Sequence, residues 1–113
     1  MSPSDLKSMT LSQLRETRSA LSKYEYLLEV EKLSPEKRAE AALVSDSVQM
    51  AFLKMRNAEL AEIRDKLIQN EKELESGTKS VKIALEDLKK VENILSVVGS
   101  FVGIVGKIIP LVV

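Results

Sequence analysis

The sequence predicts an all-α protein in which long antiparallel helices form a helical hairpin or three-helix coiled-coil bundle, followed by a C-terminal hydrophobic helix. Apolar residues recur at three- and four-residue steps, which is typical of amphipathic helices. From Leu60 to Ile109 they also recur every seven residues, as in a coiled coil. Residues 94–113 carry a single charge, Lys107. We therefore divide the chain into a helical body, residues 1–93, and a hydrophobic segment, residues 94–113.

The first helix is expected near residues 9–33. Thr10 to Gln13 has the pattern of a capping box, in which a hydroxyl and an amide side chain satisfy the first free backbone N–H groups. An apolar face then continues to the end of this range. Ser2 followed by Pro3 offers an alternative and earlier start, because serine caps helices and proline suits the first helical position.

The second helix is expected over residues 35–76. Proline disfavours helical geometry in the residue before it, so Ser34 and Pro35 form a boundary at which Ser34 caps the new helix. The apolar stripe loses phase around Arg56-Asn57 and then resumes. We interpret this loss of phase as a local irregularity within one helix. The short connection at Ser34 predicts that the first two helices pack as an antiparallel hairpin.

A turn at Ser76-Gly77-Thr78 is expected to separate the second helix from a third, near residues 79–109. Glycine is preferred just after a helix end, and Thr78 is a suitable cap for the next helix. The heptad runs through Gly77 without a change of phase, so a continuous helix that tolerates a glycine at a cost of about 1 kcal/mol is the alternative. The coiled-coil seam comprises Leu60, Leu67, Leu74, Val81, Leu88, Val91 and Leu95. We expect self-association, because one protomer of this size leaves such a seam partly uncovered.

The hydrophobic segment, residues 94–113, has three interpretations. As a membrane span it has sufficient length and apolarity. Gly99 and Gly103 form a G-x-x-x-G pair, and together with Gly106 they would allow close packing of helices in lipid. Lys107 opposes insertion by about 2.5–3.5 kcal/mol at mid-membrane, but it lies close enough to the chain end for its amine to reach the headgroups.

The two other interpretations keep the segment out of a permanent span. It can be the core helix of a soluble bundle, because the heptad continues into it. Apolar residues also lie off the seam, so such a helix has to be buried on nearly every side. Alternatively it inserts conditionally, since its glycines, single lysine and branched aliphatic residues resemble in composition the membrane-active helices of short lytic peptides.

Composition argues against catalysis and nucleic-acid binding. The chain has 17 basic and 17 acidic residues, whereas nucleic-acid affinity rests on many lysine and arginine contacts to phosphate. It contains neither histidine nor cysteine, which removes the usual catalytic triads and zinc ligands. Glu59 and Glu62 share a helix face, but we interpret them as a solvated surface. We therefore predict no catalytic residue, metal site, cofactor or small-molecule substrate.

These features predict a non-enzymatic helical interaction or structural protein anchored in a membrane by its C-terminal segment. The N-terminus lacks the apolar core of a secretory signal, so we expect a cytoplasmic body at a membrane. The expected partners are the lipid membrane and either further copies of the chain or another helical protein. A membrane-permeabilising protein whose glycine-rich tail inserts and oligomerises is the first alternative, and a soluble helical adaptor bundle is the second.

Overall fold

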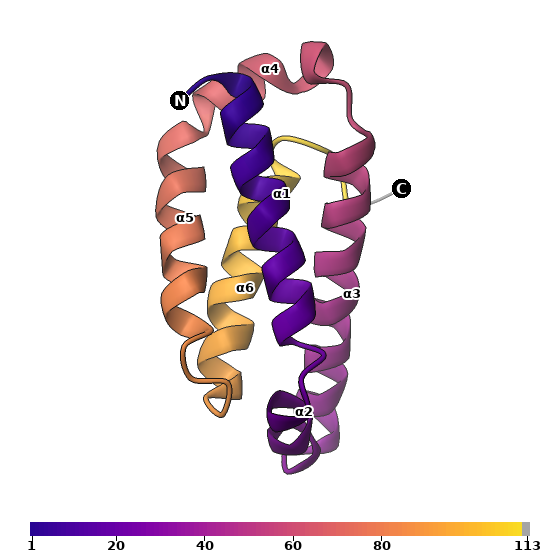
Figure 1. Cartoon of the computed structure of the whole chain (residues 1–113). Coiled ribbons are helices and arrows are strands. Elements are labelled where there is room, and N and C mark those ends of the chain that lie inside the picture. The colour runs from indigo at the N-terminus through magenta and orange to yellow at the C-terminus, as the bar shows by residue number, and fades with distance from the viewer. Residues whose placement is uncertain (112–113) are drawn as a thin grey trace.

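Four helices of the protein run along the long axis of the molecule, and two short helices close its ends (Figure 1). The computed structural model describes residues 1–111, which contain six α-helices and no strand. The helices are α1 (Pro3–Ala20), α2 (Tyr24–Glu31), α3 (Pro35–Asn57), α4 (Leu60–Gln69), α5 (Glu71–Ala84) and α6 (Val91–Gly106). The prediction of an all-α helical bundle is confirmed.

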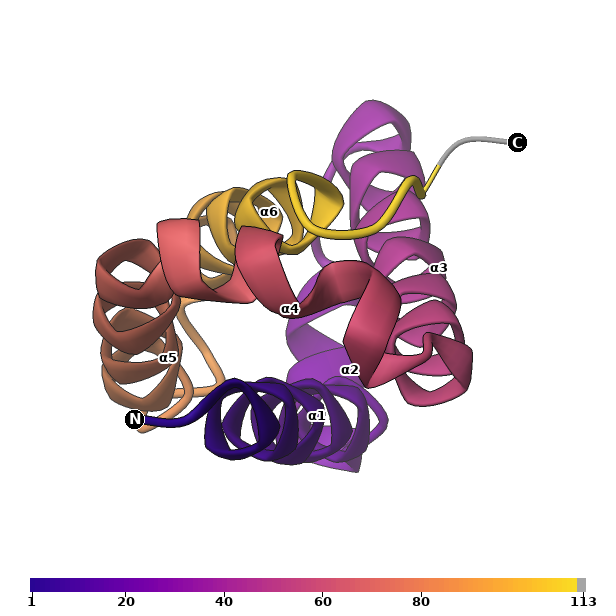
Figure 2. The same cartoon turned by 90° about the horizontal axis from the view of Figure 1, so that it is seen from above.

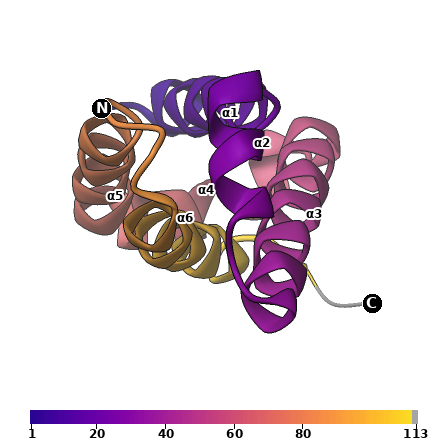
Figure 3. The same cartoon turned by 90° about the horizontal axis from the view of Figure 1, so that it is seen from below.

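The four long helices form a ring in which α1 and α6 each pack against both α3 and α5. In Figure 1, α1 and α5 run downwards and α3 and α6 run upwards, so α1 is antiparallel to α3 and α5 is antiparallel to α6. Helix α4 crosses the upper end of the ring from α3 to α5 (Figure 2). Helix α2 lies across the lower end beside α3 (Figure 3). The apolar core fills the space between the four helices.

Helix α1 begins at the earlier of the two predicted starts. The Ser2 hydroxyl accepts a hydrogen bond from the backbone N–H of Asp5 (3.1 Å), and the Asp5 carboxylate accepts one from the Ser2 N–H (3.4 Å). This arrangement is a capping box. The predicted box at Thr10 is wrong, because Thr10 lies inside the helix and its hydroxyl donates to the Leu6 carbonyl (2.8 Å).

The first predicted helix, residues 9–33, is in fact two helices. The chain leaves helical geometry at residues 21–23 and re-enters it at Tyr24. The change of direction buries Tyr26, whose side chain is only 1% exposed, at the lower end of the core. Its hydroxyl has no hydrogen-bond partner among residues 1–111, and burial raises the pKa of this phenol above its ordinary value of 10.0.

Replacing Tyr26 with phenylalanine is expected to raise the free energy of unfolding by about 1 kcal/mol, because a buried hydroxyl without a partner loses its hydration on folding. The folded protein keeps the phenol proton at pH values where an unfolded tyrosine loses it. The associated stability is therefore present below about pH 10 and falls as the pH rises above it. Urea unfolding at neutral and at alkaline pH measures both effects. Tyr24→Phe is the matched control, since Tyr24 is 76% exposed; an equal response of both variants would contradict this account.

The second predicted helix starts correctly and ends too late. Ser34 caps α3 by accepting a hydrogen bond from the Lys37 N–H (3.3 Å), with Pro35 at the first helical position. The helix stops at Asn57, because Ala58 is extended, with ψ of 135°. The Lys7 ammonium donates to the Ala58 carbonyl at 2.6 Å. The loss of apolar phase at residues 56–57 therefore marks the end of α3, where the chain changes direction into α4 (Figure 2), and not a local irregularity.

The predicted turn at Gly77 is wrong, and the alternative, a helix that continues through this glycine, is the one found. Helix α5 continues through this residue, and the chain turns back at residues 85–90. There the Asp87 carboxylate accepts a hydrogen bond from the Lys89 N–H (3.1 Å). The predicted third helix, residues 79–109, is thereby divided between the second half of α5 and the separate helix α6.

Helix α6 and the turn after it contribute much of the core. Seven α6 residues are buried, and Ile108 and Ile109 follow them inside. The Lys54 ammonium donates to the Pro110 carbonyl (3.1 Å) and so ties this end of the chain to α3. No helix within residues 1–111 is long and apolar enough to cross a membrane, because α6 already ends at Gly106. The predicted C-terminal transmembrane helix therefore has no support, and residues 112–113 of it lie outside the described part of the chain.

Candidate functional site

The outer side of α6 differs from the other exposed helix surfaces because it carries no charge over more than three turns. Helical spacing brings one set of exposed residues to this side. We name this set the α6 face: Glu92, Ser96, Gly99, Ser100, Gly103 and Lys107. Its two ends are charged, and everything between them is glycine or serine. The inner side of the same helix is apolar and buried.

A groove of about 500 Å³ runs beside the α6 face, between α5 and α6. Its walls include four serines, two from each helix: Ser76, Ser80, Ser96 and Ser100. Gly77 and Phe101 also line it, together with the half-buried side chains of Val97 and Ile104. Ile83, on α5 and 59% exposed, follows Ser80 by one helical turn. The groove therefore combines apolar groups with hydroxyls that can donate and accept hydrogen bonds.

Gly77 allows α5 and α6 to approach each other closely. A Cβ atom at this position would lie 2.9 Å from Cδ1 of Phe101 and 3.2 Å from Cδ1 of Ile104. The Phe101 ring is 1% exposed and is fixed by its surroundings. Gly77 is therefore required by packing, which explains why a glycine lies inside a helix here. The sequence pattern identified the residue but assigned it the opposite role.

Gly99 and Gly103 have no such role within the described chain. A Cβ atom at either position would meet nothing within 4 Å, and neither residue has positive φ. Glycine inside a helix costs about 1 kcal/mol relative to alanine. Gly106 is different, because it ends α6 and its Cβ position lies 3.6 Å from Leu111. The predicted G-x-x-x-G pair thus lies on the surface, with its backbone accessible from outside.

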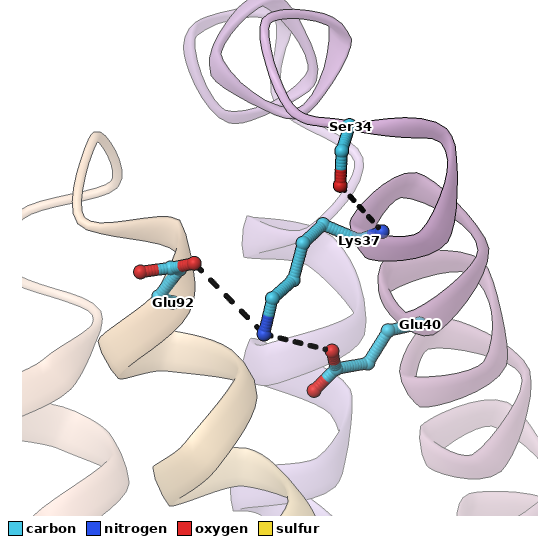
Figure 4. A network of polar contacts seen from close by, with 4 residues as sticks. All are labelled: Ser34, Lys37, Glu40 and Glu92. Atoms are coloured by element: carbon cyan, nitrogen blue, oxygen red, sulfur yellow. Dashed lines mark hydrogen bonds and ion pairs between the residues drawn. The ribbon is translucent and has the colours of Figure 1, made fainter.

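The two charges of the α6 face take part in exposed ion pairs. At the upper end, Lys107 Nζ lies 2.8 Å from a carboxylate oxygen of Glu73 on α5. At the lower end of the α6 face, Figure 4 shows Lys37 between Glu40 (3.3 Å) and Glu92 (3.9 Å), with the Ser34 hydroxyl accepting a hydrogen bond from the Lys37 backbone N–H. All of these side chains are largely exposed, so the pairs contribute little stability and can be exchanged for other partners.

The predicted coiled-coil seam lies inside the protomer. One of its seven residues, Leu60, is half-buried. The other six are buried: Leu67, Leu74, Val81, Leu88, Val91 and Leu95. They come from α4, α5, the following turn and α6, so the unbroken heptad passes through three separate helices. The seam therefore forms core and is not the exposed surface that we expected to associate.

Among residues 1–111, no group of three acidic side chains is placed to hold a metal ion. The groove serines were not anticipated from the sequence, because Ser76 and Ser96 come together only when α5 and α6 pair. Comparisons with protein-family models, with curated proteins and with solved structures found no match to this chain. The assignment of function therefore rests on the α6 face and its groove.

Proposed function

We propose that this protein is a non-enzymatic helical interaction protein that self-associates through the α6 face. The observation that carries the proposal is the pair of exposed helical glycines, Gly99 and Gly103. Each weakens α6, and no contact within the described chain compensates for it. Glycines at this spacing allow a second helix backbone to approach closely, because no side chain separates the two.

The charges of the α6 face favour an antiparallel pair of identical helices. Glu92 and Lys107 are equally far in sequence from the point between Gly99 and Ser100. A two-fold axis through that point would bring Glu92 of one copy level with Lys107 of the other, twice in each dimer. The same axis would place Gly99 level with Ser100 of the other copy and Gly103 level with Ser96, so only glycine and serine lie near the crossing. A parallel pair would instead oppose like charges at both ends.

The groove beside the α6 face supplies apolar area for the same contact. Val97 and Ile104 are half-buried in the protomer, and Ile83 on α5 is exposed. Covering such side chains would stabilise association by about 25 cal/mol per Å² of apolar surface removed from water. The serine hydroxyls beside them can form hydrogen bonds across the interface. The proposed contact thus has glycine and serine at its centre and apolar side chains beside them in the groove.

Replacing both Gly99 and Gly103 with leucine is expected to stabilise the monomer and to weaken the dimer. Each monomer should become more stable by about 1–2 kcal/mol in total, because leucine favours helix and meets no neighbour there. The dimer dissociation constant should rise by about tenfold or more, because the bulk holds the backbones apart. Sedimentation equilibrium measures association, and urea unfolding of the dilute monomer measures stability. Ala42→Leu is the matched control, since Ala42 is an exposed small residue on α3.

Charge reversal tests the orientation of the pair. Glu92→Lys should weaken the dimer, and the double change Glu92→Lys with Lys107→Glu should restore it, because the opposed charges are exchanged together. A wild-type chain that stays monomeric at millimolar concentration would refute self-association. If the wild type is monomeric but the α6 face binds a helix of another protein, the protein is still an interaction protein. Its partner is then a different protein and not a second copy of the chain.

Membrane association is the second candidate function, and one observation favours it. Residues 94–111 carry only Lys107 as a charge, and that side chain is exposed while the aliphatic residues fill the core. A bundle that opened could exchange these core contacts for lipid, either as an anchor or as a pore. Full-length chain mixed with vesicles tests this by flotation and by dye leakage. An anchor should tolerate Gly99→Leu with Gly103→Leu, whereas a pore built on glycine packing should lose leakage.

A further inference from the structure

Three arginines gather around one phenylalanine on the side of the molecule formed by α1 and α3. The guanidinium carbons of Arg18, Arg15 and Arg56 lie 4.7, 5.5 and 5.8 Å from the centroid of the Phe52 ring. Such distances allow cation–π attraction, which holds a guanidinium over a ring face. The Phe52 ring is 4% exposed, so the arginines lie between it and solvent. The ring thereby gathers three positive charges in one place.

None of these three arginines forms an ion pair within residues 1–111. Glu16, next to Arg15 in sequence, pairs instead with Lys82 on α5 (3.3 Å). Asp46 lines an adjoining depression together with Arg18, but it makes no ion pair with it. Three positive charges close together repel one another, which raises the electrostatic energy of the folded protein. A bound anion would lower that energy, because it attracts all three charges.

The surface between these helices is hollowed beside two of the three arginines, Arg15 and Arg18. A depression of about 500 Å³ is lined by Arg15, Arg18, Ser19, Ser22 and Gln49. Arginine presents a planar fork of N–H donors that matches the oxygens of phosphate, and Gln49 and Ser19 add neutral donors. The Ser22 hydroxyl donates a hydrogen bond to the Arg18 carbonyl (3.0 Å). This bond links two of the residues that line the depression, at the C-terminal end of α1.

We propose that this depression is a binding site for a phosphate-bearing anion, with Arg15 and Arg18 as its charged contacts and Arg56 as a further positive charge beside Phe52. Phe52 positions the guanidinium groups before the ligand arrives, so less side-chain freedom is lost on binding. The phosphate comes either from a free anion or from the headgroup of an anionic phospholipid, since both present the same oxygens. The site is independent of the α6 face, which lies on another side of the bundle.

Calorimetric titration of the full chain with pyrophosphate, at constant ionic strength in chloride, tests the site. Saturable binding is expected, and Arg18→Gln should weaken it about tenfold or more, because charge-assisted hydrogen bonds to phosphate are lost. Arg18→Lys should weaken it less, because the charge stays while the fork is lost. Arg38→Gln is the matched control, an exposed arginine on α3 outside the cluster. It should bind as the wild type does.

A second arm identifies the source of the phosphate. Vesicles of phosphatidylcholine alone are compared with vesicles that also contain phosphatidylglycerol, using wild type, Arg18→Gln and Arg38→Gln. Binding to the anionic vesicles that Arg18→Gln loses and Arg38→Gln keeps assigns the site to a lipid headgroup. Pyrophosphate binding without vesicle binding assigns it to a free anion. If neither probe distinguishes Arg18→Gln from Arg38→Gln, the arginines only cover Phe52 and the proposal is overturned.

Discussion

Truncating Phe101 to alanine is expected to lower the free energy of unfolding by about 3–5 kcal/mol, enough to unfold a large fraction of a small domain. The ring is 1% exposed and meets α5 where Gly77 lets the two helices approach. Removing it leaves a cavity in the core that the surrounding helices can close only in part. Urea unfolding followed by circular dichroism measures the loss.

Tyr24→Ala provides the matched control for that truncation. It removes an aromatic side chain that is 76% exposed, so the change should stay within about 0.5 kcal/mol. Equal stability of the two variants would mean that the contact between α5 and α6 is not part of the cooperative core. A loss confined to Phe101→Ala would identify this contact as essential to the bundle.

Local signals predicted two of the six helix starts within residues 1–111: that of α3 and, as the earlier of two alternatives, that of α1. Ser34 with Pro35 defines the start of α3, because a cap and a proline act on the residues beside them and need no tertiary contact. Ser2 with Pro3 does the same for α1. Thr10 carries the same kind of pattern, yet it lies inside α1, because a capping motif is also compatible with a helix that has already begun.

Helix ends were predicted poorly, because tertiary packing decides them. Residues 58–59 and 85–90 contain neither glycine nor proline, so the strongest local signals of a helix end are missing at both breaks. Leu88 keeps the heptad phase through the second of them, since it is buried in the turn just as it would be in a helix. Gly77 looked like a terminator, but its function is to admit Phe101, which lies far away in sequence.

The residues of the candidate sites could also be predicted only in part, because tertiary packing decides where they lie. Gly99, Gly103 and Lys107 were selected from the sequence as residues that pack in a membrane, and the structure places all three on the surface of the bundle. Composition alone cannot distinguish an apolar helix buried in protein from one buried in lipid. The cluster of Arg15, Arg18 and Arg56 is not visible in the sequence, because α1 and α3 must pair before these side chains meet.

Introducing leucine at Gly77 is expected to lower the free energy of unfolding by about 2 kcal/mol. Helix propensity favours leucine over glycine by nearly 1 kcal/mol, but overpacking a close contact typically costs about 1–3 kcal/mol and sometimes more. Here the Cβ atom alone would lie 2.9 Å from Cδ1 of Phe101 and 3.2 Å from Cδ1 of Ile104, so the buried ring has to shift before any larger side chain fits. The clash therefore outweighs the propensity. Gly99→Leu is the matched control, and it should be as stable as the wild type or more so, because its Cβ meets nothing within 4 Å.

A double-mutant cycle tests whether the Phe101 ring is what prevents a larger side chain at position 77. In a Phe101→Ala background the ring is gone, so Gly77→Ala should stabilise the protein by about 1 kcal/mol, as at an ordinary helical glycine. In the wild-type background the same change should gain clearly less or be destabilising, because the ring has to shift. Equal effects in both backgrounds would show that the contact at 2.9 Å imposes no constraint, and the close approach of α5 and α6 would then need another cause. Unequal effects in the stated direction would mean that a residue resembling a helix terminator in the sequence is retained to admit a ring from the neighbouring helix.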